Sequence, residues 1–152
     1  MSSSQHPSMG RPIEILLVED SPSDANLTIR NLENGKLNNH IHWVEDGDSA
    51  MAYLHQEGEY SQRPLPDIIL LDLNLPGMDG REVLEAIKTD PHLRHIPVVV
   101  LTTSDNEVDI LAAYQMSANC YITKPVDIHQ FIQVIRLIND FWLTIVKLPN
   151  LP

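Results

Sequence analysis

Short runs of apolar residues alternate along the chain with longer segments in which apolar positions recur at helical spacing. The short runs predict five strands, and the periodic segments predict five helices. The expected strands span residues 13–18, 40–44, 67–72, 96–101 and 119–123, and the expected helices span residues 23–34, 48–57, 80–89, 106–116 and 127–146. Strands that alternate with helices over short connections indicate an α/β fold, in which right-handed crossovers place helices on both faces of a parallel sheet.

The apolar pattern also predicts the order of the strands. Three strands contain the continuous runs ILLV, IILL and VVVL, which are typical of parallel strands buried on both faces. The strands at 40–44 and 119–123 alternate between polar and apolar positions, so we expect them at the two edges. The doubly wound order 2-1-3-4-5 satisfies both edges and places the topological switch point between strands one and three.

Residues that carry chemistry follow four of these strands. Glu19 and Asp20 follow the first strand, and Asp72 ends the third. Thr102 ends the fourth run, and Lys124 follows the fifth. Each residue alone has an ordinary explanation as a turn cap, a strand end or a solvated side chain. Their occurrence together at one edge of the sheet indicates a functional site.

The acidic residues of this set need a compensating charge. Two carboxylates about 4 Å apart repel by roughly 4 kcal/mol at an effective dielectric near 20, so Glu19, Asp20 and Asp72 together require protons or a cation. Mg²⁺ prefers carboxylate oxygens, carbonyls and water as ligands. Because no Cys or His stands beside the three acids, zinc is disfavoured. The sequence therefore predicts a magnesium site.

Composition narrows the possible partners and the compartment. The 152 residues carry a formal net charge of −11, which repels phosphate backbones, so we expect no direct nucleic-acid binding. One cysteine, Cys120, cannot form an internal disulfide, and we see neither a leader nor a membrane span, so we expect a cytoplasmic protein with no membrane contact. Residues 1–12 are expected to form a mobile arm, residues 13–146 one domain and residues 147–152 a tail.

The seven histidines add no second site to this prediction. His40 and His42 share one face of the second strand, but the sequence places no cysteine or cluster of carboxylates beside them. We therefore expect solvated histidines.

Four motifs occur together in the order of a known family, each at a strand end. They are LLVEDSPSDA, LLDLNLPGMDGREVL, VVVLTTS and YITKP. Through them, the chain from about Ile13 to Asp140 resembles the response-regulator receiver domains of two-component signalling. LNLPGMDGREVL, NCYITK and the ending Phe141 to Pro149 resemble the single-domain regulators that pair with cyanobacterial phytochromes. The resemblance implies a CheY-like, flavodoxin-like fold and a signalling protein, rather than an enzyme with its own substrate turnover, that accepts phosphate from a phytochrome-type sensor histidine kinase.

The resemblance also assigns the metal ligands. Asp20 and Asp72 would bind Mg²⁺ directly. Glu19 would bind it mainly through water, and Asn74 would contribute its backbone carbonyl. Asp72 would in addition be the phosphoacceptor, which attacks the phosphohistidine of the kinase.

Four further positions carry over from the family. Lys124 would pair with one phosphoryl oxygen, and Thr102 would donate its hydroxyl to another, which stabilises the charge of a phosphoryl group in transfer. The movement of Thr102 would let Tyr121 rotate inward as a switch. The Lys124–Pro125 peptide would be cis, since an X–Pro bond adopts that form at small cost.

The segment 127–146 contains more apolar residues than one buried stripe requires. A surplus apolar face often marks an interface, although a tail folded back on its own domain is an alternative. We expect a symmetric homodimer through the fourth helix, the fifth strand and the fifth helix, with the C-terminal tail at Phe141 and Trp142 contributing.

Three other functions suit a similar sheet. A phosphohydrolase of the DxDx[TV] type needs an acid/base Asp where this chain has Asn74, whose carboxamide cannot transfer that proton. A flavodoxin-like electron carrier needs a phosphate cradle where Glu19 and Asp20 would repel a flavin phosphate. A phosphorylation-independent interaction module is disfavoured because every charged site position is filled. Since no output domain is discerned, the protein is expected either to relay phosphate onward or to bind a target when phosphorylated.

Overall fold

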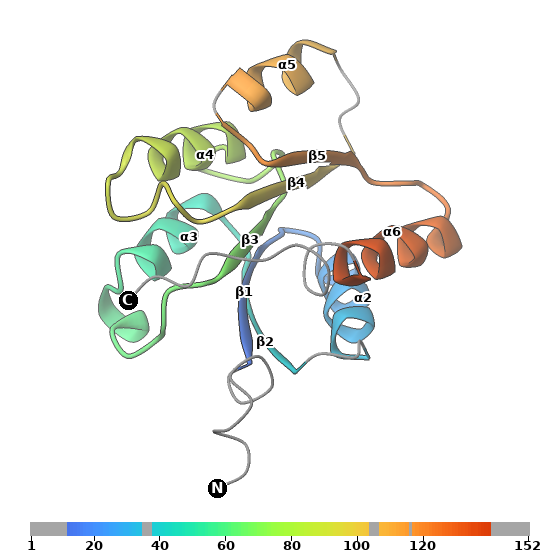
Figure 1. Ribbon diagram of the computed structural model, residues 1–152, viewed down its shortest axis with the longest axis horizontal. Helices are drawn as coiled ribbons and strands as arrows, with labels where there is room; N and C mark the ends of the chain where they lie inside the picture. The colour runs from blue at the N-terminus through green and yellow to red at the C-terminus, as the bar shows by residue number, and fades with distance from the viewer. Residues whose placement is uncertain (1–11, 35–37, 104–106, 116, 141–152) are drawn as a thin grey trace, which may run out of the picture.

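A computed structural model describes residues 12–34, 38–103, 107–115 and 117–140. Within these residues, five parallel strands form one sheet in the order β2-β1-β3-β4-β5 (Figure 1). The strands are β1 (Ile13–Val18), β2 (Asn39–Val44), β3 (Ile68–Leu71), β4 (Val98–Thr102) and β5 (Cys120–Thr123). The predicted fold class, strand order and edge strands are confirmed.

Helices cover both faces of the sheet, with α5 beside β5 at its edge (Figure 1). They are α2 (Pro22–Glu33), α3 (Gly47–Leu54), α4 (Gly80–Thr89), α5 (Glu107–Gln115) and α6 (Ile128–Asp140), and a 3-10 helix, η2 (Gly58–Tyr60), follows α3. The predicted helix at 48–57 is too long, because Gln56 takes a left-handed conformation with φ 54° that ends α3. The predicted helix at 127–146 is described only to Asp140. No helix in the described part of the chain has both the length and the apolar content to cross a membrane.

Side chains of β1 alternate between two hydrophobic layers. Leu16 and Val18 pack into the layer under α3 and α4, and Ile15 and Leu17 pack into the layer under α2 and α6. Burying one such side chain fully stabilises the fold by about 1.5–3 kcal/mol relative to leaving it exposed. The sheet is therefore covered on both faces, which leaves the ends of the strands as the place where polar side chains can form a site.

Neighbouring strands end in register at the carboxyl edge of the sheet. Val18 of β1 pairs with Leu71 of β3 and with Val44 of β2. The ladder continues one residue further, because the N–H of Asp72 donates to the Val18 carbonyl and the N–H of Glu19 donates to the Val44 carbonyl, both at 3.0 Å. Backbone hydrogen bonds therefore hold the first residues after β1 and β3 at one place.

Candidate functional site

Three carboxylates meet at the carboxyl edge, beside the switch point between β1 and β3. One oxygen each from Glu19, Asp20 and Asp72 lies within 4.8 Å of the others. Glu19 and Asp72 are buried, whereas Asp20 is exposed to solvent. The structure brings these three side chains together as the sequence predicts. Oxygen donors of this kind fit a hard divalent cation such as Mg²⁺ or Mn²⁺, which keeps several water ligands on its open side.

Asp72 is held in place by the start of α4. A Cβ atom on Gly80 would lie 2.4 Å from the Asp72 carbonyl oxygen and 2.5 Å from the Leu73 Cα, so only glycine allows α4 to begin this close to the strand end. The N–H of Gly80 donates to the Leu73 carbonyl at 3.1 Å. The N–H of Asn74 donates to the Asp72 carboxylate oxygen Oδ1 at 2.9 Å. The Asp72 side chain is therefore oriented by the backbone around it.

Lys124 is the cation of the site. Its backbone N–H donates to the Thr102 carbonyl at 2.6 Å, which extends the pairing of β4 and β5. Its ammonium Nζ lies 2.6 Å from Oε1 of Glu19, 2.9 Å from Oδ2 of Asp24 and 3.1 Å from Oδ2 of Asp72. An ammonium has three hydrogens, so each of them has a carboxylate partner.

Burial and charge act against one another in this cluster. Burial raises the pKa of Glu19 to about 7, the Lys124 ammonium opposes that rise, and the charge of Asp72 adds to it. Burial by itself would lower the pKa of Lys124, but the hydrogen bonds that its ammonium donates to Glu19 and Asp24, with the charges of Asp72 and Glu19, raise that pKa above its ordinary value. Lys124 therefore carries its charge at neutral pH, whereas Glu19 is only partly ionised there.

Thr102 and Asn74 lie on the β4 side of the crevice. Thr102, the last residue of β4, is fully buried. The amide nitrogen of Asn74 donates to the Thr102 hydroxyl at 3.2 Å and approaches the Thr103 hydroxyl at 3.4 Å. Since Asn74 also contacts Asp72 through its backbone N–H, the Thr102 hydroxyl lies in the same crevice as the phosphoacceptor candidate.

Two other predicted positions have different outcomes. Tyr121 is half-buried and packs against the hydrophobic layer under α3 and α4, and its N–H donates to the Tyr114 hydroxyl at 3.2 Å. Its role as a switch stays a prediction. The predicted cis peptide between Lys124 and Pro125 is wrong, because no cis peptide bond occurs in the described residues. The trans form is favoured by about 0.5–1 kcal/mol in X–Pro bonds, and in it the Lys124 ammonium already reaches the crevice.

Sequence reasoning missed Asp24 as a partner of Lys124. Asp24 lies in the first turn of α2, where an acidic side chain has an ordinary explanation as a favourable charge at a helix start. A second signal was present, because Asp24 is only four positions after Asp20, in the first turn of the helix that begins at the same strand end.

The expectation of solvated histidines is confirmed for His40, whose side chain is 57% exposed, but not for His42, whose side chain is 17% exposed. Oε2 of Glu14 lies 3.2 Å from Nδ1 of His40, and Oε1 of Glu14 lies 3.0 Å from Nε2 of His42. Arg63 contacts the other ring nitrogen of His42 at 3.1 Å. Glu14 pairs with His40 across β1 and β2, so only the strand register reveals this group. It lies at the amino ends of the strands, remote from the acidic crevice.

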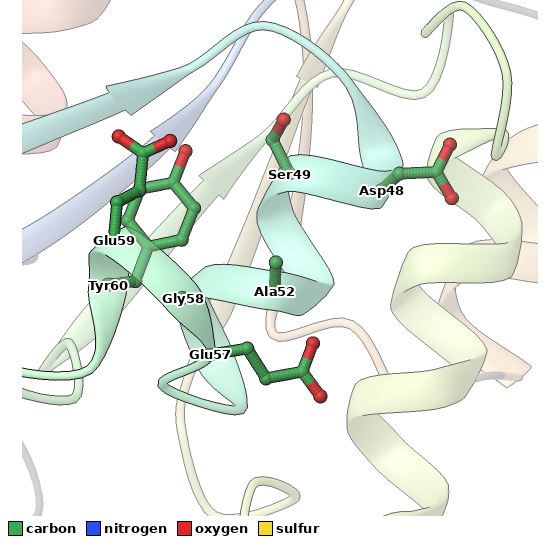
Figure 2. A pocket seen from close by; sticks show the side chains of 7 residues that line it. All are labelled: Asp48, Ser49, Ala52, Glu57, Gly58, Glu59 and Tyr60. Carbon is green, nitrogen blue, oxygen red and sulfur yellow. The ribbon is translucent and has the colours of Figure 1, made fainter.

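An open pocket of about 350 Å³ lies on α3 and η2, away from the crevice (Figure 2). Its lining includes none of the predicted site residues. The carboxylates of Asp48, Glu57 and Glu59 point in different directions around it (Figure 2), so they do not form a common binding site.

Comparisons with known proteins agree with the fold. Residues 15–136 match the family model of the response regulator receiver domain. Response regulator Rcp1 of Synechocystis sp. is 49% identical over 138 residues, which cover 91% of this chain and 94% of that protein. The crystal structure of the phosphorylated cyanobacterial phytochrome response regulator RcpA has a TM-score of 0.89 and 50% identity, and covers 92% of this chain and 100% of that chain. The Mn²⁺-bound form of Rcp1 has a TM-score of 0.89 and 48% identity, and covers 91% of this chain and 100% of that chain. This chain belongs to the response regulator receiver family.

Proposed function

We propose that this protein is a single-domain response regulator that accepts a phosphoryl group on Asp72 from a phytochrome-type sensor histidine kinase. The observation that carries the proposal is the cluster of Asp72, two further acids and the Lys124 ammonium at one edge of the sheet. The likeness of this chain to the cyanobacterial phytochrome response regulator RcpA supports the phytochrome pairing. The protein acts in the cytoplasm by switching its contacts with partners, without nucleic-acid or membrane binding and without a substrate turnover of its own.

In the proposed reaction, a carboxylate oxygen of Asp72 forms a bond to phosphorus. The bond between phosphorus and the histidine nitrogen of the kinase breaks, and its electron pair stays on the imidazole. The moving group spreads negative charge over three peripheral oxygens, so the receiver must supply positive charge and hydrogen bonds. Lys124 would pair with one of these oxygens, and the Thr102 hydroxyl would donate to another. No acid/base side chain is required.

The acidic cluster would hold Mg²⁺ during this reaction. Asp20 and Asp72 would be direct ligands, Glu19 would act mainly through water, and Asn74 would contribute its backbone carbonyl. The three carboxylate oxygens that converge within 4.8 Å support this assignment. When bound, the ion neutralises charge on the carboxylates and on the phosphoryl oxygens.

The kinase partner can be tested with labelled phosphate. Two purified histidine kinases, one with a phytochrome sensor and one with an unrelated sensor, are labelled and then mixed with this protein and Mg²⁺. We expect rapid transfer of label from the phytochrome kinase and much slower transfer from the other. Equal transfer from both would contradict the phytochrome pairing, and retention of label on both kinases would contradict the function itself.

Switching is proposed to act on the face formed by α5, β5 and α6. Phosphorylation would draw Thr102 toward the new charge and let Tyr121 move. Exposed apolar side chains gather on these elements and on the segment before α6, which supports an interface there. They are Leu111, Tyr114, Val126, Ile128 and Leu137. We propose that a second copy of the chain covers this face to form a symmetric homodimer; residues 141–152, assigned to the same contact by the sequence, lie outside the described residues.

The homodimer can be tested by placing a charge on this face. Leu137→Glu would bury an unpaired carboxylate in the interface, so we expect it to shift the protein toward monomer in sedimentation velocity at tens of micromolar. Leu65→Glu is the matched control, because Leu65 is exposed but lies between η2 and β3. A wild-type monomer, with and without phosphorylation, would contradict the proposed dimer.

A further inference from the structure

We propose that Asp24 is a positioning residue for phosphotransfer, which acts by holding the Lys124 ammonium over Asp72. The inference rests on the proposed function, because it concerns the cation that would meet the phosphoryl group. Oδ2 of Asp24 lies 2.9 Å from Nζ of Lys124, a shorter distance than the 3.1 Å from Nζ to Oδ2 of Asp72.

The three partners of Lys124 have different fates during phosphotransfer. Glu19 and Asp72 are members of the acidic cluster that fits a metal ion, whereas the cluster found in the described residues does not include Asp24. Asp72 also gives up a carboxylate oxygen to the new bond with phosphorus. Asp24 is therefore the partner that keeps both oxygens available for Lys124 throughout the reaction.

The backbone of Asp24 is fixed independently of its side chain. Its N–H donates to the Ser21 hydroxyl at 3.3 Å, and its carbonyl accepts from the Thr28 hydroxyl at 2.8 Å. Pro22 and the Ser21 cap fix the start of α2. The carboxylate thus extends from a rigid helical turn toward an ammonium whose side chain is 4% exposed, while its own side chain is 32% exposed.

This arrangement restricts where the ammonium can lie. A lysine side chain has four rotatable bonds and loses much freedom when it is held in one position. With Asp24 in place, Lys124 is held from the α2 side as well as from β1 and β3. Without it, one of the three ammonium hydrogens loses its partner, and the side chain can turn toward the opening of the crevice.

Kinetics with a small phosphodonor separate a positioning role of Asp24 from electrostatic repulsion of the donor. With phosphoramidate and Mg²⁺, we expect Asp24→Asn to lower the maximal rate of phosphorylation roughly tenfold, which corresponds to a loss of one oriented interaction in the transition state. Asp24→Glu should recover part of that rate, because it restores the carboxylate. If Asp24 only repelled the donor, Asp24→Asn would instead lower the half-saturating donor concentration at an unchanged maximal rate, and the inference would be overturned.

A second readout needs neither phosphate nor metal. In EDTA, we expect Asp24→Asn to lower the midpoint of urea unfolding. The decrease should be larger in the wild-type background, where Lys124 is present, than in a Lys124→Met background. Asp48→Asn is the matched control, because Asp48 is an acidic residue in the first turn of α3. Its effect should be the same in both backgrounds. An equal effect of Asp24→Asn in both backgrounds would show a helix-start role only and would overturn the inference.

The two proposals fail in different ways. A wild-type protein that takes no phosphoryl group from phosphoramidate contradicts the proposed function and, with it, the role of Asp24 in phosphotransfer. A wild-type protein that is phosphorylated, with an Asp24→Asn variant that matches its maximal rate, contradicts the role of Asp24 alone.

Discussion

Asp72→Asn is expected to reduce phosphoryl acceptance to background. A carboxamide has no anionic oxygen, so it cannot form the acyl phosphate at a comparable rate. The change otherwise preserves the local shape, because the remaining amide oxygen can still accept the Asn74 N–H, which lies 2.9 Å from Oδ1 in the wild type. The loss should be measured by intact mass spectrometry after incubation with phosphoramidate and Mg²⁺.

The matched control for this change is Asp67→Asn. Asp67 precedes the other end of β3, where its Oδ2 accepts the N–H of Glu14 at 2.9 Å. We expect this variant to be phosphorylated at the wild-type rate. Phosphorylation of the Asp72→Asn protein at that rate would exclude Asp72 as the acceptor.

Lys124→Met is expected to lower the free energy of unfolding of the metal-free protein by about 3–5 kcal/mol near neutral pH. Methionine has a similar length but carries no charge, so Glu19 and Asp72 would be left buried without their shared cation. Their side chains are 3% and 6% exposed, so water can replace the ammonium only in part. Urea denaturation in EDTA measures the loss, and added Mg²⁺ should recover part of it.

The effect of Lys124→Met should depend on pH in a defined direction. The pKa of Glu19 is about 7 in the folded protein, against an ordinary value of 4.5. The folded protein therefore binds this proton more tightly than the unfolded chain does, so the stability that it contributes is full below pH 4.5 and is lost as pH rises through about 7. Removing the ammonium raises the pKa of Glu19 further. We therefore expect a smaller loss at about pH 5.5, where Glu19 is protonated, than at about pH 8.

Lys88→Met provides the comparison. The Lys88 ammonium donates to the carbonyls of Ile96 at 2.7 Å and Arg94 at 3.1 Å. Within the described residues it forms no ion pair with a carboxylate. Its replacement should cost about 1–3 kcal/mol through lost hydrogen bonds, with little difference between the two pH values. A loss in Lys124→Met that is no larger than this, or that does not change with pH, would contradict the assignment of Lys124 as the cation of the site.

Much of the fold follows from the apolar pattern. The apolar runs within β1, β3 and β4 are continuous because helices cover both sides of these strands, and this pattern, together with the doubly wound order, arranges the sheet. The end of α3 could not be predicted in the same way. Gln56 takes a left-handed conformation there, although glutamine is a residue type that usually continues a helix.

The site was predictable as far as strand ends determine it. Glu19, Asp20 and Asp72 follow strands whose neighbours can be inferred, so their convergence follows from topology. The contact of Asp24 depends on how α2 tilts over the strand end, and the contact of Glu14 with His40 depends on register. Helix tilt and strand register come from packing between segments distant in sequence, and a linear pattern contains neither.

The ammonium group joins the site from far along the chain, since Lys124 and Glu19 are 105 positions apart. During translation the acidic residues leave the ribosome well before Lys124 does. A nascent chain that has folded β1 and β3 therefore carries the negative crevice without the positive charge that completes it. The charge balance of the crevice is therefore reached only after Lys124 has been synthesised and β5 has paired with β4.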